Sequence, residues 1–490
     1  MTRLSHSALS TLADRKGLIV PSYDVRDLRV GIVHLGVGAF HRAHQAVYTE
    51  DCLDGVSGGG DWGICAYTQR SDTAAAALAP QDGLYTLIER DAQAAVPRIV
   101  GSLREVRSAI SDPIRIPARI ADPAVRIVTL TVTEKGYRLD HAGRLDATDP
   151  LTAEDAARFR DDSHRPATVA AQLAAALELR RRQDSGPLTI VSCDNLPGNG
   201  PALRAAVHDF CRLVPGGDEL SEWIDAHTAF PATMVDRIVP AATPADHAEA
   251  RRLTGLEDRA TVVCEHYRQW VIEDHFVTPR PQWESAGATF TRDVGPYEAV
   301  KLRMLNATHS LIAYTGALAG HSTIAEALQD PAIADAATQL MATDAAPALR
   351  PPVQLDLADY QRSVLERFAN PALGHSTSQV AADGSAKLPI RLFPTIEERL
   401  DSGAEPFWAA LAVAAWMVFV TRRTDRRGRP LVVQDPLAEG LEPLADLLHN
   451  PTRFVDAFLA RRDIFPAGLQ GNATFRRLLS QHTRQLLASS

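Results

Sequence analysis

Short apolar runs that alternate with helix-like segments are the feature of this sequence that most restricts its fold. The first run is VGIVHLGVG (30–38), and similar runs are WGICAY (62–67), VRIVTLTVT (125–133) and PLTIVSCDN (187–195). Helix-like segments lie between them, including the Ala- and Arg-rich stretch 165–183. Buried strands that alternate with helices are typical of a parallel, doubly wound sheet. We therefore expect an α/β domain in the first part of the chain.

The strand-like pattern fades after about residue 286, and helical patterns dominate the rest of the chain. The segment 294–320 has no proline or glycine between Glu298 and Tyr314, which favours a long helix. The most apolar stretch, 407–420, is too short to span a bilayer and predicts a buried helix. The second part of the chain is therefore expected to be a mainly α-helical domain.

The length of 490 residues favours two large domains. We expect an α/β domain at residues 1–286 and a mainly helical domain at 287–490. The proline-bearing segment 278–282 marks the region where one passes into the other.

Charge and cysteine usage exclude several classes of protein. The net charge of -9 and the pI of about 6.0 give no electrostatic footprint for nucleic acid or for an anionic membrane. The five cysteines are scattered and form no CxxC pair, which argues against a disulfide framework or a zinc ribbon. The N-terminus lacks the layout of a signal peptide. These features predict a cytoplasmic protein without a metal site.

A glycine-rich turn follows the first strand-like run. Its pattern is G-x-G-x-x-H, with Gly36 and Gly38 in the places that allow a tight turn and a close approach to a pyrophosphate. Phe40 lies in the same turn, and Arg42 is a candidate cation for phosphate. The second strand ends without the acidic residue that usually holds ribose hydroxyls, and Arg70 is a candidate for binding a 2′-phosphate. NAD and NADP both stay open, as does a turn that merely joins a strand to a helix.

The densest set of chemical groups lies in EAVKLRMLNATH (298–309). On a regular α-helix, Lys301, Asn306 and His309 fall within an arc of roughly 140°. The apolar neighbours predict burial, which lowers the pKa of a lysine and lets it accept a proton near neutral pH. The amide of Asn306 and the imidazole of His309 are candidates to stabilise a developing oxyanion. Glu298 is a candidate to pass the proton from the lysine to water. The structural alternative is a lysine that reaches the surface beside a core histidine.

Further polar residues follow predicted strands. Asn195 follows the run 187–195, where ligands bind in open α/β sheets, while the adjacent Asp194 is a candidate cap for the next helix. Glu134 follows the run 125–133 in the same way. An arginine follows Asp236 directly. These adjacent charges predict either a structural ion pair or, for Asp236, a contact to a substrate hydroxyl. Lys387 lies in a predicted turn and is either an anion contact or part of an exposed loop.

Together these segments resemble the mannitol dehydrogenase family of long-chain polyol-specific dehydrogenases, which includes fructuronate reductases. The matching segments, in family order, are HLGVGAFHRAHQA, TLTVTEKGY, SCDNLPGNG, FPATMVDRIVP, EHYRQWVIED, VKLRMLNATHS and DGSAKLP. The resemblance implies a Rossmann-type N-terminal domain, a helical C-terminal domain and metal-independent hydride transfer between NAD and the substrate. The family's functional residues fall on Lys301 (general base), Asn195 and Asn306 (oxyanion site), Asp236, His309 and Lys387 (substrate contacts), Glu298 (proton gate) and Glu134 (lining the same region).

One departure from the family pattern bears on the substrate. Mannitol dehydrogenases tend to have an arginine eight residues before the lysine that matches Lys387, whereas this chain has Gln379, as is usual in fructuronate reductases. A hexuronate carries a carboxylate, so its pocket is expected to offer a cation such as Arg367, Lys387 or Arg391. The expected partner is thus a sugar alcohol or a hexuronate, bound by a monomer or a small homo-oligomer.

Three other functions stay open. A sugar-phosphate dehydrogenase, such as one acting on mannitol 1-phosphate, requires a clustered basic subsite. A non-catalytic nucleotide-binding sensor would have lost Lys301 or the asparagines, which this chain retains. Zinc-dependent alcohol oxidation requires a set of Cys and His ligands that the sequence does not offer.

Overall fold

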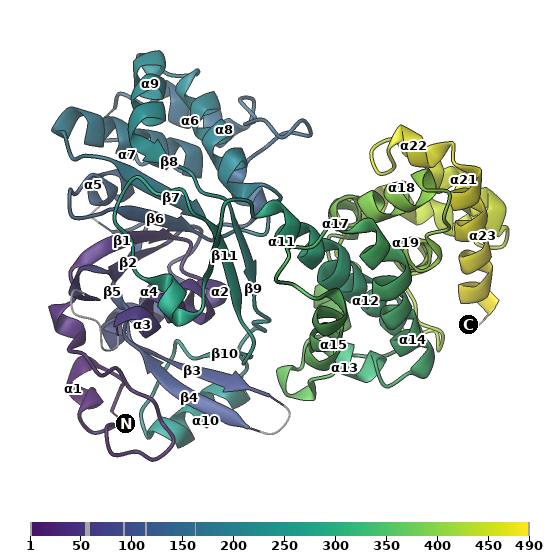
Figure 1. Ribbon diagram of the computed structural model, residues 1–490, viewed down its shortest axis with the longest axis horizontal. Coiled ribbons are helices and arrows are strands. Elements are labelled where there is room, and N and C mark those ends of the chain that lie inside the picture. Colours follow the sequence, from purple (N-terminus) through teal and green to yellow (C-terminus); the bar gives the residue numbers. More distant parts are fainter. Residues whose placement is uncertain (1, 54–58, 92–93, 113–114, 162, 489–490) are drawn as a thin grey trace. The chain divides into compact units, whose positions relative to one another are not determined.

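The computed structural model describes residues 2–53, 59–91, 94–112, 115–161 and 163–488. Contacts divide the chain into two compact units, Met1–Val294 and Gly295–Ser490. The sequence placed the change between the α/β and helical domains at 286/287. The first unit contains the α/β architecture, and the second is helical, as expected (Figure 1).

The main sheet of unit 1 has six parallel strands in the order β5-β2-β1-β6-β7-β8. Their bounds are Leu103–Ser108 (β5), Gly63–Thr68 (β2), Val30–Leu35 (β1), Ile127–Leu130 (β6), Leu188–Ser192 (β7) and Thr228–Ala229 (β8). The pairs Leu35↔Tyr67 and Leu35↔Leu130 bring the carboxyl ends of neighbouring strands to one edge. The prediction of a parallel, doubly wound sheet is confirmed.

Hydrophobic side chains cover both faces of this sheet. Val33 and Leu35 of β1 belong to one core cluster, whereas Ile32 of the same strand belongs to another. Alternate side chains therefore point to opposite helical layers, and apolar strands buried on both faces are typical of parallel sheets. The helices of unit 1 are His6–Leu9 (α1), Ala39–Ala43 (α2), Gln45–Leu53 (α3), Thr73–Leu78 (α4), Ile116–Ile120 (α5), Pro150–Ala157 (α6), Val169–Gln183 (α7), Asn199–Cys211 (α8), Gly217–His227 (α9) and Pro244–Thr254 (α10).

Two three-stranded sheets were not foreseen from the sequence. One has the order β10-β3-β4, and the other β12-β11-β9. Their strands are Val262–Glu265 (β10), Tyr85–Arg90 (β3), Ala95–Val100 (β4), Thr289–Thr291 (β12), Gln269–Glu273 (β11) and Thr233–Asp236 (β9). β3 and β4 form a local hairpin, but β10 pairs with β3 from far along the chain, and other segments separate β9, β11 and β12. Local patterns therefore contain little information about these pairings.

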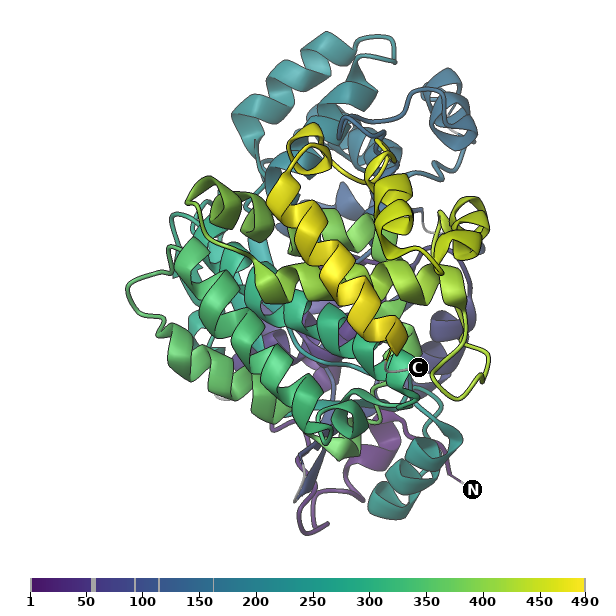
Figure 2. The same ribbon diagram turned by 90° about the vertical axis from the view of Figure 1, so that its right-hand side faces the viewer.

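Unit 2 is built around the apolar helix predicted at 407–420. This helix, α19 (Phe407–Arg422), contacts both α12 (Ala307–Ala319) and the C-terminal helix α23 (Ala473–Ala488), the latter drawn in yellow in Figure 2. Trp416 and its apolar neighbours on α19 are fully buried, as predicted. The helices of unit 2 are Gly295–Val300 (α11), Ala307–Ala319 (α12), Ile324–Ala327 (α13), Pro331–Gln339 (α14), Leu357–Phe368 (α15), Thr377–Ala381 (α16), Gly384–Arg391 (α17), Phe393–Asp401 (α18), Phe407–Arg422 (α19), Ala438–Leu441 (α20), Pro451–Leu459 (α21), Ala467–Gln470 (α22) and Ala473–Ala488 (α23).

The long helix expected around residue 301 is present, but it is not a uniform α-helix. Between α11 and α12 the chain forms a π-helical segment, η6, at Lys301–Asn306. Hydrogen bonds from residue i to i+5 widen such a turn and rotate the side chains that follow it. The 140° arc expected for a regular α-helix therefore does not apply between Lys301 and Asn306.

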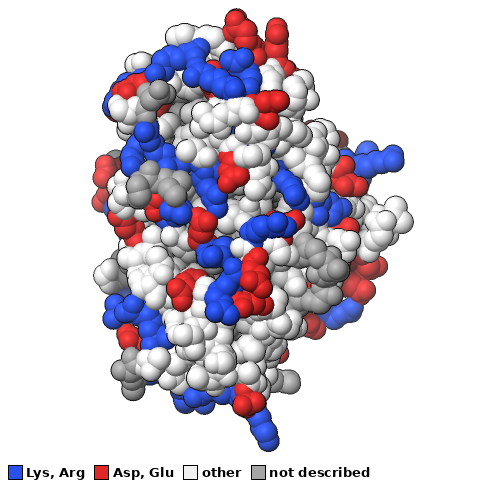
Figure 3. Space-filling view, turned by 90° about the vertical axis from the view of Figure 1, so that its left-hand side faces the viewer, with Lys and Arg blue, Asp and Glu red and all other residues white. Residues whose placement is uncertain are grey.

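The outer surface of unit 1 mixes charges of both signs. Figure 3 shows basic and acidic side chains interspersed over the face that it presents. Ion pairs such as Arg204–Asp225 and Arg158–Asp161 lie on this unit. Among the described residues, no helix has the length and apolar character needed to cross a membrane.

A buried arginine holds together the amino-terminal edge of the main sheet. Arg180 of α7 is 1% exposed, and its guanidinium donates hydrogen bonds only to backbone carbonyls. The acceptors before β6 are Ile120, Asp122 and Val125, and those before β7 are Ser185, Gly186 and Pro187. Burial lowers the pKa of Arg180 to about 10, so the guanidinium stays charged at neutral pH. One side chain thus aligns the starts of two adjacent strands.

Replacing Arg180 by Met should lower the free energy of unfolding of unit 1 by about 3 kcal/mol or more, because buried carbonyls lose their donors. Urea denaturation followed by circular dichroism measures the change. Arg181→Met is the matched control, since Arg181 pairs with Glu178 and its loss should shift the free energy by less than about 1 kcal/mol. Equal effects of the two substitutions would contradict this role for Arg180.

Candidate functional site

The glycine turn after β1 has two glycines with different tasks. Gly36 has a φ of 100°, and a Cβ there would lie 2.2 Å from the carbonyl oxygen of Thr131, so only glycine fits. A Cβ on Gly38 would meet only the Gly36 oxygen, at 3.8 Å. Gly36 therefore permits the turn, and Gly38 leaves open space beside the backbone. Such a cradle fits the pyrophosphate of a dinucleotide.

A cavity of about 440 Å³ adjoins this turn. It is lined by residues 36–38, by the end of β2 and the start of α4, and by 131–133 and 259–261. The predicted residues Gly36, Gly38, Arg42 and Arg70 all line it. Four of the residues predicted to bind the cofactor thus meet at one cavity, and their role in binding stays a prediction.

Two residues predicted to bind the cofactor do not line this cavity. The ring of Phe40 stacks on His44, with 5.0 Å between the ring centroids. Glu134 begins the 3-10 helix Glu134–Tyr137 (η4) and is exposed. Only the residues just before Glu134, at 131–133, contribute to the wall.

Arg42 is held by backbone carbonyls of the cavity wall. Its Nε donates to Gly38 O at 3.2 Å, and its Nη1 donates to Ala260 O. Burial lowers the pKa of its guanidinium. Arg42 thus braces the glycine turn against the segment before β10 while it faces the cavity.

A buried carboxylate organises the carboxyl-terminal edge of the sheet. Asp194, two residues after β7, accepts hydrogen bonds from the Thr133 amide at 2.7 Å and from the Tyr137 hydroxyl at 2.8 Å. Thr133 has a φ of 68°, a strained value for a β-branched residue. The reading of Asp194 as a helix cap is wrong, since α8 begins only at Asn199 and Gly198 is its N-cap. Asp194 instead holds the strained loop that lines the cavity.

The loop that carries Asn195 is tied to β9. The side-chain amide of Asn199 donates through Nδ2 to the backbone carbonyls of Asp194 at 3.0 Å and of Thr233 at 2.9 Å. Asn195 itself is exposed within this unit, whereas Asp236, at the end of β9, is buried. Asn199 therefore links the two segments that carry the predicted residues, a role that the sequence analysis did not assign to it.

Arg237 has a structural role. Its guanidinium donates to Ala43 O at 2.5 Å and to Glu265 O, and it forms an ion pair with Glu89. The predicted Asp236–Arg237 pair thus gives way to a pair between Arg237 and Glu89. The alternation of side chains along β9 explains this, because adjacent residues point to opposite faces.

In unit 2, the predicted residues of the lysine helix are buried. Lys301 (7% exposed), Asn306 (6%) and His309 (9%) are all buried on η6 and α12. The ring of His309 stacks on Phe368 at 4.4 Å, next to the buried Arg367 at the end of α15. This part of the predicted site forms within a single unit.

Basic side chains surround His309. Burial and the positive charges of Arg391, Arg367 and Lys387 hold the pKa of His309 well below its usual value, and His375 contributes in the same direction. Arg391 donates to Ser310 Oγ at 3.0 Å and to Asn306 O at 3.3 Å. The imidazole of His309 is thus neutral at physiological pH in a positively charged setting.

His375 is a member of this cluster that sequence analysis missed. Its ring lies edge-on to that of His309, 4.8 Å away, and burial with Lys387 lowers its pKa to about 4. Among the described residues, neither His375 Nδ1, His309 Nε2 nor Asn306 Nδ2 has a hydrogen-bond partner. These buried polar atoms are suited to a ligand with several hydroxyls. The sequence around His375 (GHST, 374–377) gave no signal for a ligand site, because a lone histidine in a loop is common.

Gln379, singled out as a marker of the substrate, lies on α16 and is exposed. Its backbone N–H donates to the Oγ of Ser376, the N-cap of that helix, at 3.2 Å. Lys387, eight residues later on α17, donates to Ala382 O at 2.6 Å. Lys387 is one of the charges that lower the pKa of His309.

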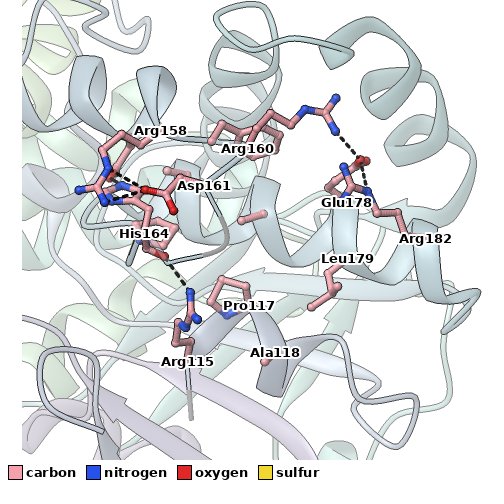
Figure 4. Close-up of a pocket in the computed structure, with 15 residues that line it drawn as sticks. Arg115, Pro117, Ala118, Arg158, Arg160, Asp161, His164, Glu178, Leu179 and Arg182 are labelled. Carbon is pink, nitrogen blue, oxygen red and sulfur yellow. Dashed lines mark hydrogen bonds and ion pairs between the residues drawn. The ribbon is translucent and has the colours of Figure 1, made fainter. Parts of the chain in front are cut away.

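A second cavity of unit 1, of about 270 Å³, is rich in arginine (Figure 4). Its charges are largely neutralised within the protein. Arg158 pairs with Asp161, Arg182 pairs with Glu178, and Arg115 donates to the carbonyl of His164. We therefore do not assign the candidate site to this cavity.

The described residues contain no group of three or more His, Cys, Asp or Glu side chains arranged to hold a metal ion. All five cysteines are buried free thiols. Burial raises the pKa of each; for Cys52 it rises to about 11. These thiols therefore pack as apolar side chains.

Fold and site together define a dinucleotide-dependent oxidoreductase with a lysine-bearing helical unit. Comparison with known proteins identifies its family. The model of the mannitol dehydrogenase Rossmann domain matches residues 30–285, and that of the mannitol dehydrogenase C-terminal domain matches residues 293–487. The chain belongs to the mannitol dehydrogenase family and is a dehydrogenase of the polyol and sugar-acid class.

Three relatives illustrate this similarity. The D-mannonate oxidoreductase of Escherichia coli is 40% identical over 95% of both chains. The mannitol 2-dehydrogenase of Cereibacter sphaeroides is 40% identical over 83% of this chain and 84% of its own. The Pseudomonas fluorescens mannitol 2-dehydrogenase, solved as a ternary complex with NAD and D-mannitol, superimposes with a TM-score of 0.89. It is 36% identical over 99% of this chain and 97% of its own.

The Asp194 contacts predict a pH-dependent stability. Burial raises the pKa of Asp194 from 3.8 to about 6, so its ionisation opposes folding. The protonated form of Asp194 therefore favours the folded state. Its contribution to the free energy of unfolding is complete below about pH 4 and is lost as the pH rises through about 6, a change of about 3 kcal/mol. Unfolding free energies of the wild type and Asp194→Asn should therefore converge or cross over this range. Asp184→Asn, at an exposed aspartate, is the control. A difference in unfolding free energy between the wild type and Asp194→Asn that stays constant over this pH range would contradict the prediction.

Proposed function

We propose that this chain reversibly oxidises a secondary alcohol of a sugar acid to the ketone, as in the interconversion of mannonate and fructuronate. The observation that supports this most is the basic cluster of Arg367, Lys387 and Arg391 around His309. A sugar acid carries a carboxylate that three nearby cations stabilise, whereas a neutral polyol does not need them. The similarity to a D-mannonate oxidoreductase across 95% of both chains supports the same substrate class.

Lys301 is the proposed general base. Its amine takes the proton of the substrate hydroxyl while the C–H bond on the same carbon breaks and the hydride leaves. When bound, the nicotinamide dinucleotide accepts that hydride in oxidation and supplies it in reduction. In the reductive direction the ammonium of Lys301 returns the proton to the oxygen. Burial of Lys301 supports this role, since a desolvated amine exchanges a proton near neutral pH more readily than an exposed one.

The remaining predicted residues are proposed to bind the substrate around that lysine. Asn306 Nδ2, which is buried without a partner among the described residues, donates to the carbinol oxygen as negative charge develops. Asn195 is proposed as the second donor. His309 and Asp236 bind substrate hydroxyls. The neutral imidazole of His309 offers one nitrogen as a donor and the other as an acceptor.

Glu298 is proposed to relay the proton. It lies on α11, three residues before Lys301, so the two share one face of the helix just ahead of the π-helical segment. A carboxylate in that position accepts the proton that Lys301 has taken and passes it to water. Glu134, exposed on η4, is proposed to border the same region.

Replacing Lys301 by Ala should lower kcat by about 10²–10⁴-fold, the usual contribution of a general base. Steady-state rates of NAD(P)H oxidation with fructuronate and with fructose measure the loss. A small alkylamine added to the variant should restore part of the rate, which a merely structural lysine would not allow. Exposed Lys16→Ala is the control. Near-normal turnover of Lys301→Ala would refute the mechanism.

The basic cluster predicts for which substrate kcat/KM falls more when one of its cations is removed. Arg367→Gln should lower kcat/KM for fructuronate by about tenfold or more, because a hydrogen bond to a charged group contributes about 1.5–3 kcal/mol. The value for fructose should change much less. Arg362→Gln, on the same helix but exposed, is the matched control. Equal losses for both substrates, or faster turnover of fructose by the wild type, would favour a neutral polyol instead.

A further inference from the structure

The segment 423–437, which joins α19 to α20, reaches the first turn of helix α17 and caps it. The backbone N–H of Asp383, the N-cap residue of α17, donates to Gln434 O at 2.7 Å. The next residue, Asp435, accepts hydrogen bonds from the backbone N–H of Ser385 at 2.8 Å and from its hydroxyl at 2.5 Å. The side chain of Asp383 forms no cap of its own. Asp435 therefore supplies, from outside the helix, the carboxylate that a helix start favours.

The same carboxylate joins α17 to the core of unit 2. Asp435 accepts a hydrogen bond at 3.2 Å from Nε1 of Trp416, a fully buried side chain of α19, and one at 3.0 Å from the backbone N–H of Leu437. A Cβ on Gly384 would lie 2.4 Å from that indole nitrogen and 2.5 Å from the hydroxyl of Tyr314 on α12. The first turn of α17 thus lies directly against two core helices, and Asp435 ties it there.

Helix α17 depends on these contacts because it is weak on its own. It has eight residues, Gly384–Arg391, and Pro389 within it has no N–H to donate to the preceding turn. Isolated helices of this length are marginal in water. Capping by Asp435 therefore contributes much of what keeps the first turn of α17 in place.

Two of the cations that surround His309 are carried by α17. They are Lys387 and Arg391, the last residue of the helix, and both lower the pKa of His309. The guanidinium of Arg391 also donates to the carbonyl oxygen of Asn306, on the π-helical segment. Because α17 is so short, a shift of its first turn moves both charges. The positions of the two cations therefore depend on how Asp435 holds the helix.

We propose that Asp435 is a positioning residue for the substrate: through the first turn of α17 it sets the places of Lys387 and Arg391, and hence the affinity for a substrate carboxylate. This inference rests on the proposed function, in which those cations bind that carboxylate. Asp435 acts through the helix, because the first turn of α17, the indole and the start of α20 engage its oxygens. Its loss should weaken substrate binding and leave proton transfer at Lys301 largely unchanged.

Steady-state kinetics of Asp435→Ala with fructuronate tests this role. KM should rise about tenfold, because charge-assisted bonds to one carboxylate are weakened, while kcat should fall by less than about threefold. Asp435→Asn retains one oxygen as an acceptor for Ser385 and should restore part of the affinity. Asp425→Ala is the matched control, since this buried carboxylate of the same segment accepts from N–H groups within the segment. Its KM should stay near that of the wild type.

A double-mutant cycle separates positioning from a merely structural role. In a chain that already lacks both cations (Lys387→Met with Arg391→Met), Asp435→Ala should change KM by less than about twofold, because α17 then has no charge to misplace. Equal fold-increases of KM in the two backgrounds would overturn the inference. An unchanged KM of Asp435→Ala in the otherwise wild-type chain would overturn it as well.

Hydrogen–deuterium exchange provides a readout that does not depend on the substrate. The amides of 384–391 should exchange about tenfold or more faster in Asp435→Ala than in the wild type or in Asp425→Ala. Unchanged exchange would overturn the inference while the proposed function stands. Faster turnover of fructose than of fructuronate by the wild type would overturn the sugar-acid proposal, and with it the carboxylate as the group that these cations bind. The exchange rates and the cycle, measured with fructose, would then still decide whether Asp435 positions α17.

Discussion

The in-register parallel sheet of unit 1 is the constraint on which the candidate cofactor site depends. Parallel pairing of β1 with β2 and β6 brings their carboxyl ends to one edge, where the glycine turn and two loops meet. Arg180 holds the opposite edge through buried bonds to carbonyls, and Asp194 holds the loop around Thr133. Two buried charged groups thus align strand ends that packing alone would leave free to shift.

Unit 2 depends on a different constraint, the π-helical segment Lys301–Asn306 within a long buried helix. A π-turn is rarely tolerated in an α-helix and is frequently found at functional sites. Here it changes the direction of the side chains between the lysine and the asparagine. Packing against α15 and α17 then brings Arg367, Lys387 and Arg391 near His309. A mostly apolar helix thereby acquires a positively charged polar face.

Much of the fold and part of the site could be predicted from the sequence because local patterns determine them. The glycine turn, the apolar strands and the helix 407–422 depend on neighbouring residues, and they were located correctly. The pairing of β10 with β3, the contact of Asn199 with Thr233 and the edge-on packing of His375 on His309 join distant segments, so no local pattern contains them. Phe40 stacks on His44, four residues further along the chain, and its part in cofactor binding stays a prediction.

The sequence by itself determined the doubly wound architecture and the residue types of the site, because strand periodicity, glycine spacing and a lysine among apolar residues are local properties. Only the tertiary structure decided which of those residues act together. It turned Asp72 towards Ser108, paired Arg237 with Glu89, and assigned Asp194 to the Thr133 loop. The physical reason is that a charged side chain near a protein interior takes the partner that folding brings within reach, whatever their separation along the chain.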